Sequence, residues 1–279
     1  MINYKNRILV IIITYNPELK FLYNNLKKFE GTDVLIIDNN SRTISEITDL
    51  VSNSKYYNLI ENNANVGIAE ALNQGLSYAQ DNAYKYILTM DQDSSFRNDF
   101  LKLKQGFSLL ENVAIVSPSI IDYNSNNKDF AKEKFEEVFM AITSGCLCDV
   151  KSLLDVGGFN SSLFIDYVDF EICLKLQQKK YKILKSRDVV LNHSLGFSKV
   201  YKIWGIKFIS TNHNESRRYY NARNRMFLAK KYFFIFPKFV IHNQLSFLKT
   251  ILIIFLFENE KNKKIRSIFK GIKDGIKMK

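Results

Sequence analysis

The chain has 279 residues, 46% of them hydrophobic and 24% charged, which is the composition of a globular protein. Its length allows one large domain or a domain with an appendage, and three cysteines are too few for a disulfide framework. The net charge of +12 comes from residues 199–279, which hold 19 Lys and Arg against 4 Asp and Glu. Such a basic segment indicates an anionic partner, either lipid headgroups or nucleic acid.

The cysteines and the N-terminus both favour a reducing, cytoplasmic location. Cys146 and Cys148 have no neighbouring His or Cys that would complete a zinc site, so we expect them and Cys173 to be core thiols. Residues 1–7 lead directly into an apolar run without a small-residue cleavage site. We interpret that run as a first strand and not as a signal peptide.

Apolar runs that alternate with helical patterns predict an α/β fold. Ile8–Thr14 is a continuous β-branched run, as expected of a strand buried on both faces of a parallel sheet. Val34–Ile37 and Tyr86–Met90 are further predicted strands, and Leu59-Ile60 is a weaker one. Residues 66–80 place their apolar side chains on one helical stripe. This order predicts helices packed on a mainly parallel sheet.

Polar residues follow three of these strands, at Thr14–Asn16, Asp38 and Asp91–Asp93. Open α/β sheets bind ligands beyond the carboxyl ends of their strands. The sequence has neither a G-x-G-x-x-G after its first strand nor a G-x-x-x-x-G-K-[ST], which argues against dinucleotide oxidoreductases and P-loop enzymes. The remaining interpretation is a nucleotide site in which Asp38 holds the base or ribose and a metal at Asp93 holds the diphosphate.

Asp91 and Asp93 are the candidate ligands of that metal. Residues i and i+2 of a strand point to the same side, so the two carboxylates converge if the strand geometry continues through them. Two hard oxygen ligands beside a phosphate suit Mg²⁺ or Mn²⁺. The alternative is a polar loop that caps the strand.

A second candidate centre lies at the start of a later predicted helix. If residues 166–180 are helical, Asp169 falls on the apolar stripe, where burial would make a carboxylate more basic. This suits a general base, and a structural buried acid is the alternative. Glu171 has a simpler explanation in an i,i+4 ion pair with Lys175, and Asp166 in a helix N-cap.

Other polar positions have both a structural and a functional interpretation. Asn65 and Gly67 open the helix of residues 66–80, whose N–H groups either face donor phosphates or a sugar, or are simply capped. Arg223 suits bidentate contact with a phosphate, or a structural salt bridge. A lone histidine such as His193 is more often a hydrogen-bonded structural residue than a ligand.

The motifs occur in one order along residues 7–230: Ile12–Asn16, Asp38–Ser41, Asn65–Ala69, Asp91–Asp93, Thr143–Gly145, Gly157–Phe159, Phe164–Glu171, His193–Gly196 and Tyr219–Asn224. In this order they resemble family 2 glycosyltransferases of the GT-A fold, and more narrowly the bacterial rhamnosyltransferase branch that builds surface polysaccharides. The resemblance implies an inverting transferase that uses a nucleotide sugar, with dTDP-L-rhamnose as the expected donor. Its acceptor would be a growing, lipid-linked glycan.

The resemblance also assigns roles to residues. It makes Asp169 the catalytic base, and it places His193 with Asp93 against the metal or diphosphate. The residues expected at the nucleotide are Thr14, Tyr15, Asn16, Asp38, Asn65, Gly67 and Asp91. Two alternatives stay open, namely transfer of galactofuranose or a hexose from a UDP-sugar, and a catalytically silent partner in polysaccharide assembly.

We expect a GT-A domain over residues 1–205 and a helical extension over residues 206–279. The uninterrupted apolar stretch Ile251–Phe257 is far shorter than the roughly 20 residues that span a bilayer. Residues 261–279 combine one apolar helical stripe with many lysines, which indicates an in-plane anchor on the inner face of an anionic membrane. A dimerisation helix is the alternative, and nucleic acid is disfavoured because it has no use for the apolar stripe.

Overall fold

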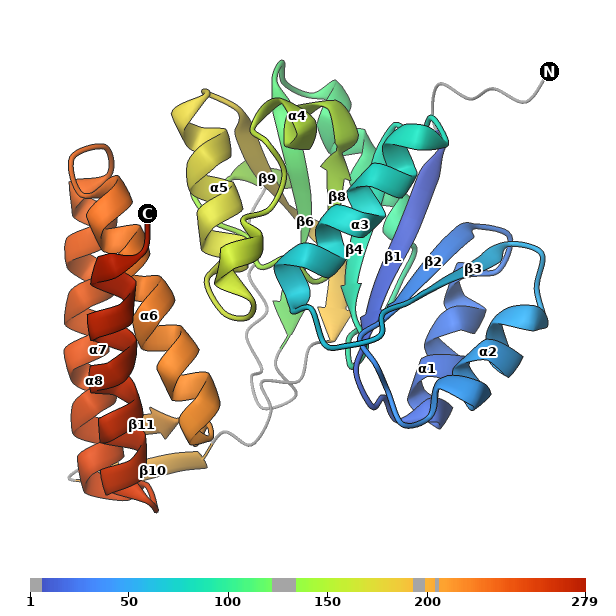
Figure 1. The fold of residues 1–279 in the computed structure, drawn as a ribbon. Helices are drawn as coiled ribbons and strands as arrows, with labels where there is room; N and C mark the ends of the chain where they lie inside the picture. Colours follow the sequence, from blue (N-terminus) through green and yellow to red (C-terminus); the bar gives the residue numbers. More distant parts are fainter. Residues whose placement is uncertain (1–6, 122–133, 193–198, 204–205) are drawn as a thin grey trace. The chain divides into compact units, whose positions relative to one another are not determined.

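The computed structural model describes residues 7–121, 134–192, 199–203 and 206–279 (Figure 1). The chain divides into two compact units. The N-terminal unit comprises Met1–Phe164 and Val168–Ser194, and the C-terminal unit comprises Ile165–Tyr167 and Leu195–Lys279. The C-terminal unit therefore begins at Leu195 and not after the predicted boundary at residue 205, and it also includes a short stretch from the middle of the chain.

The N-terminal unit is built on a mixed sheet. Its strands are β1 (Ile8–Thr14), β2 (Asp33–Asp38), β3 (Tyr57–Glu61), β4 (Tyr86–Asp91), β5 (Ser95–Phe96), β6 (Val113–Ile121), β7 (Phe135–Glu137), β8 (Cys146–Asp149) and β9 (Lys182–Asn192). Among the described residues the order is β3-β2-β1-β4-β8-β6-β9-β5, with β7 paired to β9. The strands β3, β2, β1 and β4 are parallel, whereas β8 runs antiparallel to β4 and β6. The predicted mainly parallel α/β sheet is confirmed.

Helices cover both faces of this sheet. They are α1 (Leu19–Leu26), η2 (Lys27–Phe29), α2 (Ile44–Ser52), α3 (Ile68–Asp81), η3 (Phe100–Ser108), α4 (Val150–Asp155), η4 (Ser161–Leu163) and α5 (Val168–Gln178). Parallel strands are joined by right-handed crossovers. The connections from β1 to β2 and from β2 to β3 each lead to the next strand on one side of β1, whereas the connection from β3 leads back past β1 to β4 on its other side. The helix α3 of this last connection therefore lies on the face of the sheet opposite α1 and α2 (Figure 1).

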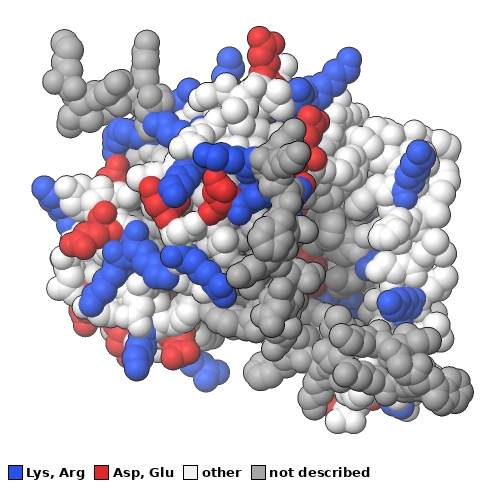
Figure 2. All heavy atoms as spheres, turned by 180° about the vertical axis from the view of Figure 1, so that it is seen from behind, with Lys and Arg blue, Asp and Glu red and all other residues white. Residues whose placement is uncertain are grey.

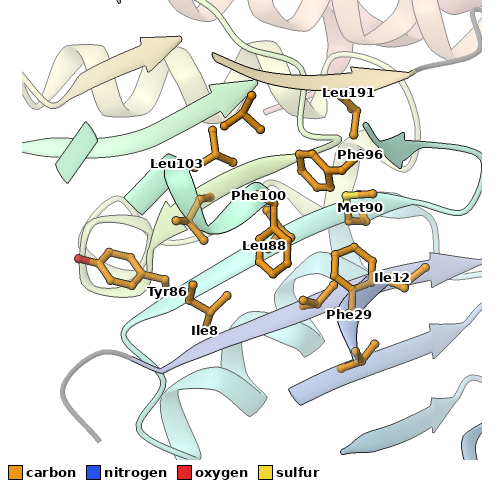
Figure 3. Close-up of a cluster of buried hydrophobic side chains, with 14 of the residues drawn as sticks. Ile8, Ile12, Phe29, Tyr86, Leu88, Met90, Phe96, Phe100, Leu103 and Leu191 are labelled. Atoms are coloured by element: carbon orange, nitrogen blue, oxygen red, sulfur yellow. The ribbon is translucent and has the colours of Figure 1, made fainter. Parts of the chain in front are cut away.

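The strand β1 shows why its sequence is apolar throughout. Ile8 and Ile12 belong to a buried cluster on one face, where Phe29 and Phe100 also pack (Figure 3). Ile11 points to the other face and touches Gly75 of α3, where an added Cβ would lie 2.6 Å from its Cδ1. Alternate residues of a strand point to opposite faces, and here both faces are covered.

The C-terminal unit consists of a hairpin and three helices. The hairpin pairs β10 (Lys199–Ile203) with β11 (Ile206–Ser210), and the helices are α6 (Glu215–Tyr232), α7 (Pro237–Phe257) and α8 (Lys261–Lys277). Gly271 and Gly275 of α8 face the backbone of α6 so closely that neither position has room for a Cβ. Small residues at such a contact allow two helices to approach one another closely.

The apolar stripe of α8 is divided between the protein and the surface. Ile268 is buried in a small core with Ala222 of α6 and Phe247 and Ile254 of α7, and other isoleucines of α8 pack against this core. Phe269 and Ile276 of the same stripe are 67% and 57% exposed. The stripe therefore packs partly within the C-terminal unit, and membrane contact by α8 stays a prediction.

The helix α7 is also longer than the sequence interpretation allowed. Its 21 residues are continuous through the polar positions that separate the apolar runs. Among the described helices, α7 is the one whose length and composition would suffice to cross a membrane. The apolar stretch considered from sequence is only the last part of this helix.

Candidate active site

The carboxyl ends of β2, β1 and β4 lie next to one another at one edge of the sheet. Thr14 at the end of β1 is in register with Asp38 at the end of β2, and Ile13 is in register with Asp91 at the end of β4. The polar residues that the sequence places after three strands are therefore brought together. This edge is where open α/β sheets bind their ligands.

Asp38 is fully buried and holds this edge together. Its Oδ1 accepts hydrogen bonds from Thr14 Oγ1 at 2.7 Å and from Ser41 Oγ at 2.6 Å. Its Oδ2 accepts one from the Ser41 N–H at 2.7 Å. These bonds compensate the burial of the carboxylate, which would otherwise be costly. In this structure Asp38 fixes the loops after β1 and β2, and its predicted contact with a nucleoside stays a prediction.

Gln92 is a residue of this edge that sequence reasoning missed. The Tyr15 N–H donates to Gln92 Oε1 at 2.8 Å, and Gln92 Nε2 donates to the Tyr15 carbonyl at 3.3 Å. The Asn16 N–H donates to Ser41 Oγ at 2.7 Å. Hydrogen bonds thus join the loops after β1, β2 and β4 to one another. The Tyr15 side chain itself is 51% exposed. The sequence could identify Gln92 only as the middle residue of the Asp-x-Asp motif.

The two candidate metal ligands differ from the strand-based prediction. The strand β4 ends at Asp91, and Gln92 and Asp93 lie in a turn that the Ser94 N–H closes by donating to the Asp91 carbonyl at 3.3 Å. The alternation of strand side chains therefore does not extend to Asp93, and the condition on which the predicted convergence rested is not met. Asp91 is half-buried and Asp93 is exposed.

The donor set still fits a hard divalent cation. Mg²⁺ commonly takes only one or two carboxylates together with substrate phosphates. Asp91 and Asp93 supply two carboxylates on one turn at the ligand-binding edge. Within the residues that the structure describes, no group of three or more His, Cys, Asp and Glu gathers at one point. His193, the other predicted ligand, lies outside the described residues.

The start of α3 is occupied by the protein itself. Gly67 is the N-cap with φ of 84°, and its N–H donates to Asn65 Oδ1 at 3.0 Å. The Ile68 N–H donates to the Phe164 carbonyl at 2.6 Å. The protein's own groups therefore satisfy these amides, in line with the simpler interpretation, and the Ile68 amide holds the loop before α5. Contact between this region and a donor sugar stays a prediction.

Asn73 of α3 clamps the same loop at a second point. Its Nδ2 donates to the Phe159 carbonyl at 2.8 Å, and the Phe159 N–H donates to its Oδ1 at 2.8 Å. The adjacent Gly158 has φ of 64°, and a Cβ there would lie 2.7 Å from Asn73 Oδ1. Sequence reasoning missed Asn73, because a polar residue on an amphipathic helix has no signal that distinguishes a clamp from a solvated side chain.

The helix α5 carries the predicted base. Asp169 lies in its first turn, is half-buried, and accepts the Phe170 N–H at 2.9 Å. Glu171 is the fully buried acid, and its Oε2 lies 3.5 Å from Lys175 Nζ. The predicted i,i+4 pair is therefore present, whereas the expectation that Asp169 is the buried carboxylate is corrected. The role of Asp169 as general base stays a prediction.

The three cysteines are core thiols, as predicted. All three are buried and unoxidised. Burial raises the pKa of Cys146 and Cys148 well above the usual range and that of Cys173 to about 12. Thiols in this state are poor nucleophiles and poor metal ligands.

Two candidates belong to the C-terminal unit. Asp166 has φ of 63° and forms a 3.1 Å ion pair with Arg217. Because α5 begins at Val168, Asp166 is not its N-cap, and that prediction was wrong. Arg223 donates from Nε to Asn224 Oδ1 at 2.9 Å, and Asn224 Nδ2 donates to the carbonyls of Ile165 and Asp166, each at 2.8 Å. A phosphate contact of Arg223 stays a prediction.

The sequence model of glycosyl transferase family 2 matches residues 9–163, which is more than half of the chain. The chain belongs to this family. It is 30% identical to the dTDP-rhamnosyl transferase RfbF of Shigella flexneri, over 81% of this chain and 81% of that protein. Both findings confirm the resemblance to family 2 and to its rhamnosyltransferase-like members.

Solved glycosyltransferase structures share the fold. TarS 1–349 of S. aureus superposes with a TM-score of 0.60 and 15% identity, over 97% of this chain and 81% of that one. The same protein in complex with UDP gives 0.59 and 16%, over 96% and 80%. GalNAc-T7 with UDP, GalNAc and Mn²⁺ gives 0.57 and 14%, over 71% and 44%. The GT-A fold is confirmed, and this family 2 member is a nucleotide-sugar-dependent glycosyltransferase.

Proposed function

We propose that the protein is an inverting rhamnosyltransferase that takes L-rhamnose from dTDP-rhamnose. The carboxyl edge of β2, β1 and β4 carries the proposal. Asp38 joins the ends of β1 and β2 there, and Gln92, between Asp91 and Asp93, joins the turn after β4 to Tyr15. The 30% sequence identity to a dTDP-rhamnosyl transferase, over 81% of each chain, supports the choice of donor.

In the proposed reaction Asp169 is the general base. Its carboxylate removes the proton from an acceptor hydroxyl as that oxygen forms a new bond to the anomeric carbon. The bond between the anomeric carbon and the diphosphate oxygen breaks on the opposite face, and the nucleoside diphosphate carries away the electron pair. The half-buried position of Asp169 at the start of α5 supports this role.

The nucleotide would lie along the loops after β1 and β2. Thr14 and Asn16 hold those loops, and the exposed ring of Tyr15 suits stacking on the base. Asp93, with Asp91 and His193, would hold Mg²⁺ or Mn²⁺ at the diphosphate. The bound ion supplies positive charge where negative charge grows on the leaving group.

The acceptor would be a growing, lipid-linked surface glycan, met at the inner face of the cell membrane. The excess of Lys and Arg in residues 199–279 supports a location at an anionic surface. Such a location would bring the enzyme to an acceptor that cannot leave the lipid.

A thermal-shift panel of nucleoside diphosphates and their sugars, with and without Mn²⁺, tests the proposal. A ligand at 100 times its dissociation constant adds about 2.7 kcal/mol to the free energy of unfolding. We expect Mn²⁺-dependent stabilisation by dTDP and dTDP-rhamnose over UDP and GDP. A preference for UDP would indicate transfer of galactofuranose or a hexose. No response to any nucleotide would contradict catalysis and favour a silent assembly partner.

A further inference from the structure

The outer face of α7 is apolar and uncovered within the C-terminal unit. Every third or fourth residue of this helix is an exposed aliphatic or aromatic side chain. These residues, which we call the α7 face, are Ile241, Leu245, Leu248, Leu252, Phe255 and Leu256. Leu252 is 60% exposed, and Phe234, in the turn before α7, is 93% exposed. A contiguous apolar patch of this kind marks an interaction surface.

The packing on the opposite side of α7 argues against a helix that crosses a bilayer. Phe247 and Ile254 are buried against Ala222 of α6 and Ile268 of α8. The Arg225 side chain of α6 donates to the Asn243 carbonyl of α7. A crossing α7 would draw the packed helices α6 and α8, with their many lysines and arginines, into hydrocarbon.

The charge around the α7 face favours an anionic partner. The helix contains no Asp or Glu, and Lys238 and Lys249 are exposed along its flank. In Figure 2 the C-terminal unit has a broad uncharged surface with scattered basic side chains. The region from residue 199 to the end has 15 more basic than acidic residues, so two copies placed face to face would repel one another.

We propose that the α7 face and Phe234 lie in the plane of an anionic lipid bilayer, with Lys238 and Lys249 on the headgroups. Apolar side chains would enter the headgroup boundary while basic ones meet the lipid phosphates. The inference rests on the proposed function only in that a lipid-linked acceptor would be met at this surface. It assigns membrane binding to α7, whereas the sequence pattern indicated residues 261–279.

Vesicle co-sedimentation of the full chain tests the inference. We expect binding to vesicles that contain phosphatidylglycerol and little binding to pure phosphatidylcholine. The double variant Leu248→Glu, Leu252→Glu should lose about tenfold or more in vesicle affinity, because both positions are exposed and become acidic. The matched control is Leu101→Glu, Leu109→Glu, which alters two exposed leucines of the N-terminal unit and should bind as the wild type does.

Phe234→Ser, at a position that is 93% exposed, should weaken vesicle binding in the same direction. Unchanged vesicle binding by the α7 double variant would overturn the inference. A dimeric wild type and a monomeric variant in light scattering, with equal vesicle binding, would instead assign the face to a second copy. Retained nucleotide stabilisation in the variant would separate this result from a failure of the proposed function.

Discussion

The backbone of Phe164 lies against the bare α-carbon of Gly67, where an added Cβ would be 2.6 Å from the Phe164 carbonyl oxygen. We expect Gly67→Ala to destabilise the protein by more than the roughly 1–3 kcal/mol that a left-handed non-glycine residue costs. Denaturant unfolding measures this loss. The control is Gly31→Ala, since Gly31 has a similar φ of 77° but nothing within 4 Å of the added Cβ. Equal losses of unfolding free energy in the two variants would mean that Phe164 moves aside at little cost.

Asn224→Asp tests the clamp on the segment Ile165–Tyr167. The carboxylate keeps the shape of the amide but cannot donate to the carbonyls of Ile165 and Asp166, so two part-buried acceptors lose their partner. Such a loss costs about 1–3 kcal/mol. Thermal unfolding should show it, whereas Asn221→Asp in the same helix should have a much smaller effect. A stable Asn224→Asp protein would show that the segment does not depend on this amide.

Asp169→Asn should reduce kcat while leaving nucleotide binding intact. General-base catalysis contributes about 10²–10⁴-fold, and the amide cannot accept the acceptor's proton. The matched control is Asp155→Asn, which removes an exposed carboxylate paired with Lys179. Near-normal turnover in Asp169→Asn would remove this residue from the role of base.

Chelation should stop turnover, and added Mn²⁺ should restore it. Asp93→Asn should raise the Mn²⁺ concentration required for half-maximal activity, because the neutral amide is a weaker ligand for a hard cation. Asp81→Asn, which changes an exposed acid at the end of α3, should leave this concentration unchanged. Full activity in EDTA would contradict the metal assignment.

Glu258 makes the C-terminal unit sensitive to acid. Burial alone would raise the pKa of Glu258, but hydrogen bonds from Ser210 and Lys264 and the charge of Arg218 outweigh it and lower the pKa below 4.5. A carboxyl group with a lowered folded-state pKa stabilises the fold above its unfolded-state pKa, and this contribution is lost as the pH falls through the folded value. Stability should therefore drop below about pH 4.5.

Glu258→Gln isolates that contribution. At neutral pH it leaves Arg218 and Lys264 without their shared buried anion and should cost about 3–5 kcal/mol. The difference in unfolding free energy between wild type and variant should narrow as the pH falls below 4.5. Glu260→Gln is the control, since Glu260 pairs with Lys263 at an exposed position. A difference that stays constant with pH would contradict the assignment.

Local sequence patterns predicted the helices and strands but not the contacts between residues far apart in the chain. The β-branched run of β1 and the stripe of α3 follow from periodicity, and the polar strand ends follow from chain order. The bond between the Ile68 N–H and the Phe164 carbonyl joins positions far apart in sequence, and no local signal announces it. The clamps made by Asn73 and Asn224 were missed for the same reason.

The carboxylates show a second limit of sequence reasoning. Asp169 and Glu171 lie in the first turn of one helix, and which of them is buried depends on what covers each side of α5. Likewise, Ile268 of α8 and Leu252 of α7 are equally apolar, but the former is 2% exposed and the latter 60%. Hydrophobic periodicity identifies a face, and only tertiary packing decides whether protein or another surface covers it.

The segment Ile165–Tyr167 has a consequence for how the chain is made. Its carbonyls depend on Asn224, which is 59 and 58 residues further along the chain from Ile165 and Asp166. On the ribosome the segment therefore emerges well before the helix that holds it. In the folded protein Asp166 and Tyr167 of this segment have left-handed conformations that cost energy, and these need the support of the surrounding structure. The segment can gain these two hydrogen bonds only after α6 has been synthesised, so a translation pause between the two would extend the time that it spends without them.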